Sequence, residues 1–143
     1  MPDKISITEY RKILRDKATE AEIQDAIVGW LKEQKIPHTV SEAKRSYNEK
    51  GQLVRRIKPG WPDITGCLPY AGQFIGIECK SAKGRLRPDQ ARTLYGLYNA
   101  GALVVVARSV EDVAQLLITG RVRDCDLAEM CKYKDRVQKR RKN

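Results

Sequence analysis

The sequence predicts one α/β domain over residues 1–143, with a mixed β-sheet flanked by α-helices. Two strands joined by a turn are expected at 64–68 and 73–80. A continuous apolar run at 102–108 is of the kind expected for a buried, parallel strand. The helix expected between the last two strands begins at Pro88. A strand–helix–strand unit implies a right-handed crossover, so antiparallel and parallel pairs share one sheet.

The N-terminal part is expected to contribute a helix and a hairpin. Residues 1–18 have mixed polarity and predict an arm or a short helix. Thr19 is a suitable N-cap, and Glu22 three residues later completes a capping-box pattern. The helix should run to about Gln34. Residues 38–57 then predict a hairpin, with HTVSEAK and LVRRI as its arms and NEKG as its turn.

The C-terminal part predicts a short helix followed by a polar tail. Ser109 is expected to cap the helix VEDVAQLLITG, which closes at Gly120. The chain is polar from Arg121 onward. Residues from about 132 to 143 are expected to form a basic, disordered tail.

The charge balance predicts an anionic partner. Lys and Arg number 28 against 18 Asp and Glu, a net charge of +10, which attracts phosphate backbones. No apolar run approaches the length of a membrane span, and the N-terminus lacks the apolar region of a secretory signal. The four cysteines form no CxxC pair, which disfavours a zinc site. We therefore expect an intracellular protein with nucleic acid, rather than a membrane, as its partner.

Two carboxylates and an ammonium group are expected to meet at one end of the strand–turn–strand unit. Glu78 and Lys80 point to the same side of a strand, while Cys79 points to the other. Asp63, just before the partner strand, should lie level with Glu78. Carboxylate oxygens hold hard cations such as Mg²⁺, and a lysine beside them can orient a water or stabilise a phosphate charge. The alternative is a turn aspartate near a surface ion pair, because this short pattern also arises by chance.

A third carboxylate is expected from the first helix. Glu20 falls near the centre of the helix's apolar stripe, whereas Glu22 falls about 130° away at 100° per residue. An unpaired carboxylate that points toward the core is costly, so a role in the site would explain Glu20. Gln24, one turn further, faces the same side and is a candidate DNA contact. The apolar stripe is formed by four residues: Ile23, Ile27, Trp30 and Leu31.

Two basic segments are candidates for phosphate contact. The loop at 81–87 follows Lys80 directly, and Gln90 in the next helix could point toward the same place. The alternative for this loop is a solvated basic segment. The second segment is the predicted hairpin. The basic candidates in the loop and the hairpin are Lys83, Arg85, Arg87, Lys44, Arg45, Arg55 and Arg56.

In their order along the chain, these motifs resemble the VRR-NUC branch of the PD-(D/E)xK nucleases. The resemblance runs from about Glu20 to Asp112 and implies a restriction-endonuclease-like core. It rests on EAEIQ (20–24), GWPD (60–63), IECK (77–80), KGRLRPDQ (83–90) and VVVARSVED (104–112).

The resemblance also assigns roles to residues of this chain. It implies catalytic positions at Glu20, Asp63, Glu78, Lys80 and Gln90. Three of these (Glu20, Asp63 and Glu78) and the main-chain carbonyl of Cys79 would bind Mg²⁺ or Mn²⁺.

The same resemblance implies the substrate and the partner. Small stand-alone members look like phage or bacterial homodimers that act on branched DNA such as four-way (Holliday) junctions. The basic hairpin is longer than a minimal domain needs, which leaves the DNA-contact surface open. The alternatives are a non-catalytic DNA-binding protein on a nuclease-like fold and a nuclease for duplex or flap DNA. An RNA-binding role is less favoured, because the chain lacks an aromatic strand motif for base stacking.

Overall fold

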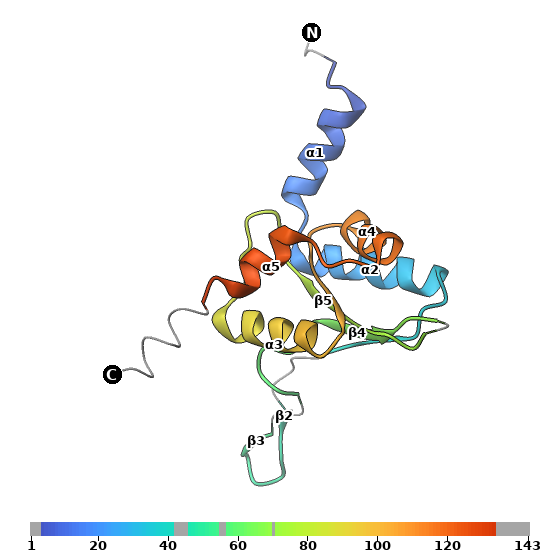
Figure 1. The fold of residues 1–143 in the computed structure, drawn as a ribbon. Helices are drawn as coiled ribbons and strands as arrows, with labels where there is room; N and C mark the ends of the chain where they lie inside the picture. Colours follow the sequence, from blue (N-terminus) through green and yellow to red (C-terminus); the bar gives the residue numbers. More distant parts are fainter. Residues whose placement is uncertain (1–3, 42–45, 55–56, 70, 134–143) are drawn as a thin grey trace.

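The computed structural model of the protein describes residues 4–41, 46–54, 57–69 and 71–133 (Figure 1). The elements are α1 (Ile7–Lys17), α2 (Glu20–Glu33), β1 (His38–Val40), β2 (Ser46–Tyr47), β3 (Leu53–Val54), β4 (Ile64–Cys67), β5 (Phe74–Cys79), α3 (Pro88–Asn99), β6 (Leu103–Ala107), α4 (Val110–Thr119) and α5 (Asp124–Cys131). Among the described helices, none has both the length and the apolar character that crossing a bilayer requires.

The main sheet is mixed, as the sequence predicts. Its strand order is β1-β4-β5-β6, with antiparallel pairing of β1 with β4 and of β4 with β5. Strands β5 and β6 are parallel, and helix α3 connects them. All residues of β6 are buried, which explains the unbroken apolar run in the sequence of this strand.

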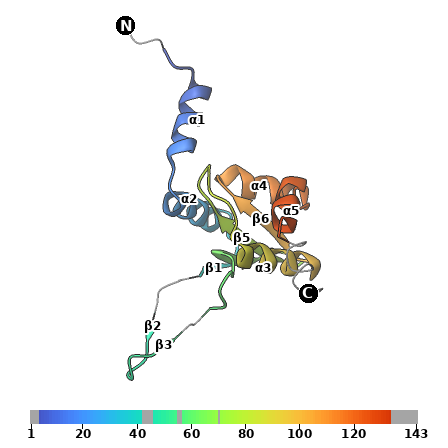
Figure 2. The same ribbon diagram turned by 90° about the vertical axis from the view of Figure 1, so that its left-hand side faces the viewer.

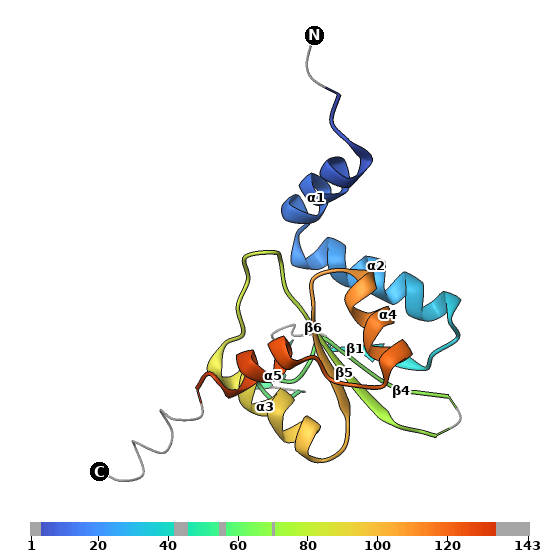
Figure 3. The same ribbon diagram turned by 45° about the horizontal axis from the view of Figure 1, so that its top comes forward.

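Helices lie on both faces of the sheet (Figures 1 and 3). Each face has its own hydrophobic core. Helices α2 and α4 cover one face, onto which Ile75, Ile77 and Cys79 of β5 project. Helices α3 and α5 cover the other face, where they pack against Val104 and Val106 of β6. Alternate residues of each strand therefore serve opposite cores, as the pleat requires. Glu78 lies on the second face of β5, beside α3.

The predicted hairpin at 38–57 is only partly correct. Its first three residues form β1, which joins the main sheet because Val40 pairs with Ile64 and packs against the first core. The hairpin itself is the shorter pair β2–β3, closed by a turn in which the side-chain oxygen of Asn48 accepts hydrogen bonds from the N–H groups of Lys50 and Gln52. Figure 2 shows this hairpin standing away from the sheet. The predicted DNA contacts of the hairpin, Lys44, Arg45, Arg55 and Arg56, lie outside the described residues.

The two ends of the described chain differ from each other. Helix α1 is stabilised by a capping box between Ser6 and Glu9, buries none of its residues and projects from the body (Figure 2). The short-helix alternative for the N-terminal segment is thus the one observed. At the other end, the expectation of a polar tail from Arg121 overlooked α5. Only Asp126 and Met130 of that helix are buried, so its sequence carries a weak apolar pattern.

Candidate active site

The pairing of β4 with β5 places Asp63 beside Glu78. Ile64 pairs with Ile77 in the antiparallel register, so the preceding Asp63 reaches the level of the next residues of β5. The Cys79 main-chain N–H donates a hydrogen bond of 2.8 Å to Asp63 Oδ2. The Ser41 N–H donates to the Asp63 carbonyl at 2.7 Å. Asp63 is therefore held by β5 through its side chain and by the chain after β1 through its backbone.

The segment before Asp63 packs closely against the start of α3. Gly60 has a φ of 84°, in the left-handed region, and a Cβ there would lie 2.6 Å from the Asp89 carbonyl oxygen. Only a glycine fits such an approach without displacing one of the two segments. This contact brings the GWPD segment and the first turn of α3, which carries Gln90, to the same side of the sheet.

Glu78 is the buried centre of the site. Its side chain is 1% exposed, and its Oε1 accepts a hydrogen bond of 2.9 Å from Gln90 Nε2. Gln90 is oriented in turn by the Arg87 N–H, which donates to its Oε1 at 3.0 Å. Glu78 Oε2 is buried and has no hydrogen-bond donor within the described part of the chain. A buried carboxylate oxygen without a donor is costly unless a cation or proton meets it.

The surroundings of Glu78 oppose its ionisation. Burial, and then the neighbouring charge of Asp63, raise the pKa of Glu78 from its ordinary value of 4.5 to about 9, although Lys80 acts in the opposite direction. A divalent cation between the two carboxylates would favour their charged forms. The pair therefore fits a metal ion by its donor chemistry. Burial also raises the pKa of the Cys79 thiol, so this side chain is a neutral member of the core.

Lys80 comes directly after β5 and connects the site to α2. Its side chain is nearly buried, and its Nζ lies 3.9 Å from Glu20 Oε1. Glu20, however, is the first residue of α2, and its side chain is 53% exposed. The prediction that Glu20 points into the core is therefore wrong, because the first turn of α2 lies at the margin of the site. Gln24, one turn further, is half-buried.

Glu20 does not complete a cluster of three carboxylates. Across the described ranges, no three His, Cys, Asp or Glu side chains come close enough to form a metal site by themselves. The structure thus brings Asp63, Glu78 and Gln90 together and places Lys80 beside them, with Glu20 at the outer edge. Glu22 is exposed, and its N–H donates to Thr19 Oγ1, which forms one half of the predicted capping box. The Glu22 side chain accepts from the Thr19 hydroxyl and not from its main-chain N–H.

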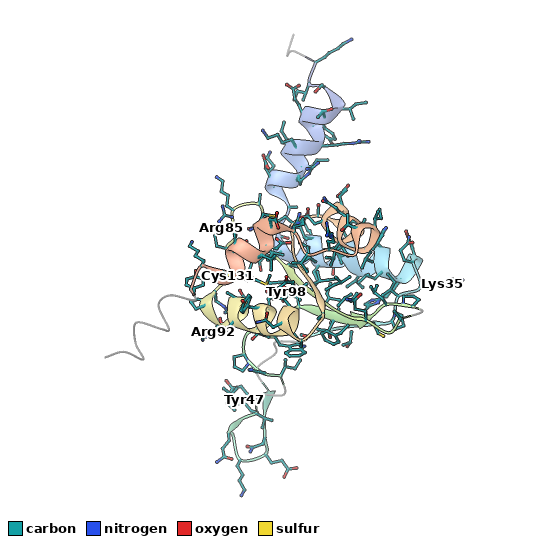
Figure 4. The ribbon with its side chains drawn as sticks, viewed as in Figure 1. Lys35, Tyr47, Arg85, Arg92, Tyr98 and Cys131 are labelled. Carbon is teal, nitrogen blue, oxygen red and sulfur yellow. The ribbon has the colours of Figure 1, made fainter. Side chains whose placement is uncertain are left out.

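The basic loop (residues 81–87) runs from Lys80 to the start of α3. Its Lys83, Arg85 and Arg87 are exposed. Arg85 donates to the Gly84 carbonyl and lies at this loop in Figure 4, and Arg87 Nε lies 3.5 Å from Asp89 Oδ1. These cations are available to solvent directly beyond the buried carboxylates, where a polyanion can reach them.

Three residues around the site were not singled out from the sequence. Gly60 makes the close approach to α3 described above. Its position at the start of the GWPD segment is the sequence signal that could have identified it. Arg108 Nη2 donates to the Gly84 carbonyl at 2.8 Å. Glu129 Oε1 accepts from the Leu86 N–H at 3.0 Å, across 43 residues of sequence. The sequence carries no local signal for these last two contacts.

The raised pKa of Glu78 predicts that the metal-free protein loses stability as the pH rises. Between pH 4.5 and about 9 the folded state holds a proton on Glu78 that the unfolded state releases, so the free energy of unfolding falls across this window. Glu78→Gln removes this titration. In a chelating buffer, the difference between the Tm of the variant and the Tm of the wild type should increase by at least about 5 °C between pH 5 and pH 9. A Tm difference that stays constant across the same pH range would contradict the raised pKa of Glu78.

Comparison with known proteins locates a family match over these same elements. The family model described as the VRR-NUC domain matches residues 7–111, which is more than half of the chain. The matched range includes Glu20, Asp63, Glu78, Lys80 and Gln90 and ends before α5. Searches of curated proteins and of solved structures gave no match.

Proposed function

Because the chain belongs to the VRR-NUC family and is therefore a nuclease, we propose that it is a metal-dependent endonuclease that hydrolyses phosphodiester bonds in DNA. The mixed sheet with flanking helices agrees with the restriction-endonuclease-like fold of this family. The observation that carries the proposal is the pair of Asp63 with the buried Glu78, whose Oε2 meets no donor in the described chain.

The residues that would hold the metal are Asp63 and Glu78. The Cys79 carbonyl would join them, and Glu20, at the outer edge of the site, would act on the metal through water. When bound, Mg²⁺ or Mn²⁺ supplies Lewis-acid activation of a water and offsets negative charge on the phosphate. Oxygen ligands suit both ions.

The remaining groups of the site orient the two carboxylates and stabilise charge on the phosphate. Gln90 donates to one oxygen of Glu78, and the second oxygen keeps no donor within the described residues. The Cys79 N–H fixes the Asp63 carboxylate in the same manner. The Lys80 ammonium group, held at the mouth of the site, can orient the attacking water or stabilise charge on the phosphate in the transition state.

The DNA would reach the site across the basic loop. Lys83, Arg85 and Arg87 are exposed cations that can contact phosphates on either side of the cleaved bond. The net charge of +10 strengthens the attraction and makes it dependent on salt. Two-stranded ribbons fit the major groove, so the β2–β3 hairpin is a second proposed contact.

The finer proposal is a homodimer that acts on branched DNA, in particular four-way junctions. Resemblance to small stand-alone members of the family supports it. Two symmetric cuts in a junction need two active sites, which a twofold dimer supplies. Helix α1 adds support, since Ile7, Tyr10 and Leu14 are exposed at helical spacing and a second copy of the chain could cover them.

A panel of labelled DNA substrates tests this finer proposal. With Mg²⁺ or Mn²⁺ present, we expect the four-way junction to be cut at least about tenfold faster than plain duplex of the same arm sequence. The cuts should be paired and symmetric. Sedimentation of the same sample should give twice the monomer mass.

Other outcomes of the panel lead to the alternatives. Preferential cutting of flaps or duplex would keep the nuclease and change its substrate. Tight binding of every DNA without metal-dependent cutting would favour a non-catalytic DNA-binding protein, as would a calorimetric titration that detects no metal binding.

A further inference from the structure

Helix α5 contacts the basic loop although it lies beyond the residues that match the family. Both main-chain polar groups of Leu86 are bound by this end of the chain. The Leu86 N–H donates to Glu129 Oε1 at 3.0 Å, and the Tyr133 hydroxyl donates to the Leu86 carbonyl at 3.1 Å. The Leu86 side chain is 2% exposed and belongs to the same core as Met130 of α5. Buried main-chain groups need such partners, so α5 fixes the loop at this residue.

A second contact ties the loop to the same helix through Arg108. Arg108 Nη2 donates to the Gly84 carbonyl at 2.8 Å and lies 3.6 Å from Glu129 Oε2. Glu129 therefore acts on two loop positions, on Leu86 directly and on Gly84 through Arg108. The side chains of Glu129 and Arg108 are both mostly buried, where such a pair is screened less by solvent than at the surface.

Helix α5 is itself anchored beside the active site. Arg123, its N-cap, donates to the Val106 carbonyl at 3.0 Å. The same guanidinium group binds Asp112 Oδ1 at 2.7 Å and the buried Asp126 at 2.9 Å. Val106 is the β6 residue that pairs with Glu78. The helix is thus fixed to the strand that neighbours the catalytic strand.

The position of the loop matters because both of its ends belong to the site. The loop begins after Lys80 and ends at Arg87, whose N–H orients Gln90 on Glu78. Between these ends it carries the like charges of Lys83, Arg85 and Arg87, which repel one another. Because Arg108 binds Gly84, and Glu129 and Tyr133 bind Leu86, the loop backbone is held to the body of the protein while its basic side chains face the solvent.

We propose that α5 and the residues directly after it are a positioning element of the nuclease. Glu129 of α5, Tyr133 just beyond its end, and Arg108 after β6 set the placement of the basic loop and of Gln90 for DNA binding and cleavage. The inference rests on the proposed function. It extends the active-site apparatus to a helix outside the matched part of the family. Glu129 and Tyr133 act through the loop and are positioning residues, not catalytic ones.

Three variants of the full chain test this role, at a temperature where each is folded by circular dichroism. Glu129→Ala removes the acceptor of the Leu86 N–H and the ion-pair partner of Arg108, and it should lower kcat and weaken DNA affinity by roughly tenfold each. Glu129→Gln should recover most of the loss, because its amide oxygen still accepts from the Leu86 N–H. Tyr133→Phe keeps the ring and removes the hydroxyl, so a loss of about threefold is expected in the same two quantities. Controls are Glu33→Ala and Tyr98→Phe, both exposed and away from the loop.

DNA affinity is measured in a chelating buffer, so that binding is measured without cleavage of the DNA. If the wild type binds DNA but never cleaves it, the proposed function fails, while the affinities still test α5. A Glu129→Ala protein with a lower Tm but wild-type affinity and kcat would show that α5 only stabilises the fold, and would overturn the inference. If that variant fails to fold, wild-type affinity and kcat in Tyr133→Phe overturn it.

Discussion

Glu78→Gln is expected to lower the rate of DNA cleavage by about a thousandfold or more while it stabilises the metal-free protein. The amide has the shape of the carboxyl group and can still accept the hydrogen bond from Gln90. It lacks the negative charge that a metal ion needs. It also removes a buried group that the folded protein ionises only above about pH 9. Cleavage kinetics and thermal unfolding of one protein preparation measure both effects.

The opposite signs of these two effects make the Glu78 test specific. A variant that merely damaged the fold would lose activity and stability together. Asp25→Asn is the matched control, since Asp25 is an exposed carboxylate on α2 and should change neither quantity appreciably. If the Glu78→Gln variant cleaved DNA at the wild-type rate, Glu78 would have no part in the mechanism.

Lys80→Met should lower kcat by about a hundredfold and leave DNA affinity within about threefold of wild type. Methionine keeps most of the length of the side chain but has no charge. Because the Lys80 side chain is only 9% exposed, it makes little contribution to the general attraction of DNA. Its loss should therefore appear in the chemical step, which single-turnover kinetics measure.

Lys83→Met is the control for that substitution. Lys83 is exposed in the basic loop, so its loss should weaken binding, reduce the salt dependence of binding and leave the single-turnover rate at saturation nearly unchanged. If the two variants behaved alike, with weaker binding and equal rates, Lys80 would be a phosphate contact and not part of the chemistry.

The centre of the site could be predicted because it depends on local rules. Strand alternation alone puts Glu78 on the side of the sheet opposite to Cys79. An antiparallel pair joined by a short turn brings the start of one strand to the end of the other, which places Asp63 at Cys79. The parallel strand β6 followed from its unbroken apolar run.

The parts that could not be predicted depend on long-range packing. Helical periodicity gave the buried stripe of α2, but the position of α2 along the sheet leaves Glu20 exposed. The residues of β1 carry the same β-propensity whether they pair within a hairpin or with β4, so the sequence does not distinguish the two. Helix α5 packs Met130 into the second core, and Arg123 and Glu129 tie it to Val106 and Leu86, which are distant in the sequence.

The most direct test of the central claim is cleavage of an end-labelled four-way junction by the wild type and by Asp63→Asn, with Mg²⁺ or Mn²⁺ and with a chelator. We expect cutting by the wild type that stops on chelation and returns when the metal is restored. It also predicts no cutting by Asp63→Asn, which should still bind the junction. Cutting that persists in the chelator, or equal cutting by Asp63→Asn, would contradict a metal-dependent site built on Asp63 and Glu78.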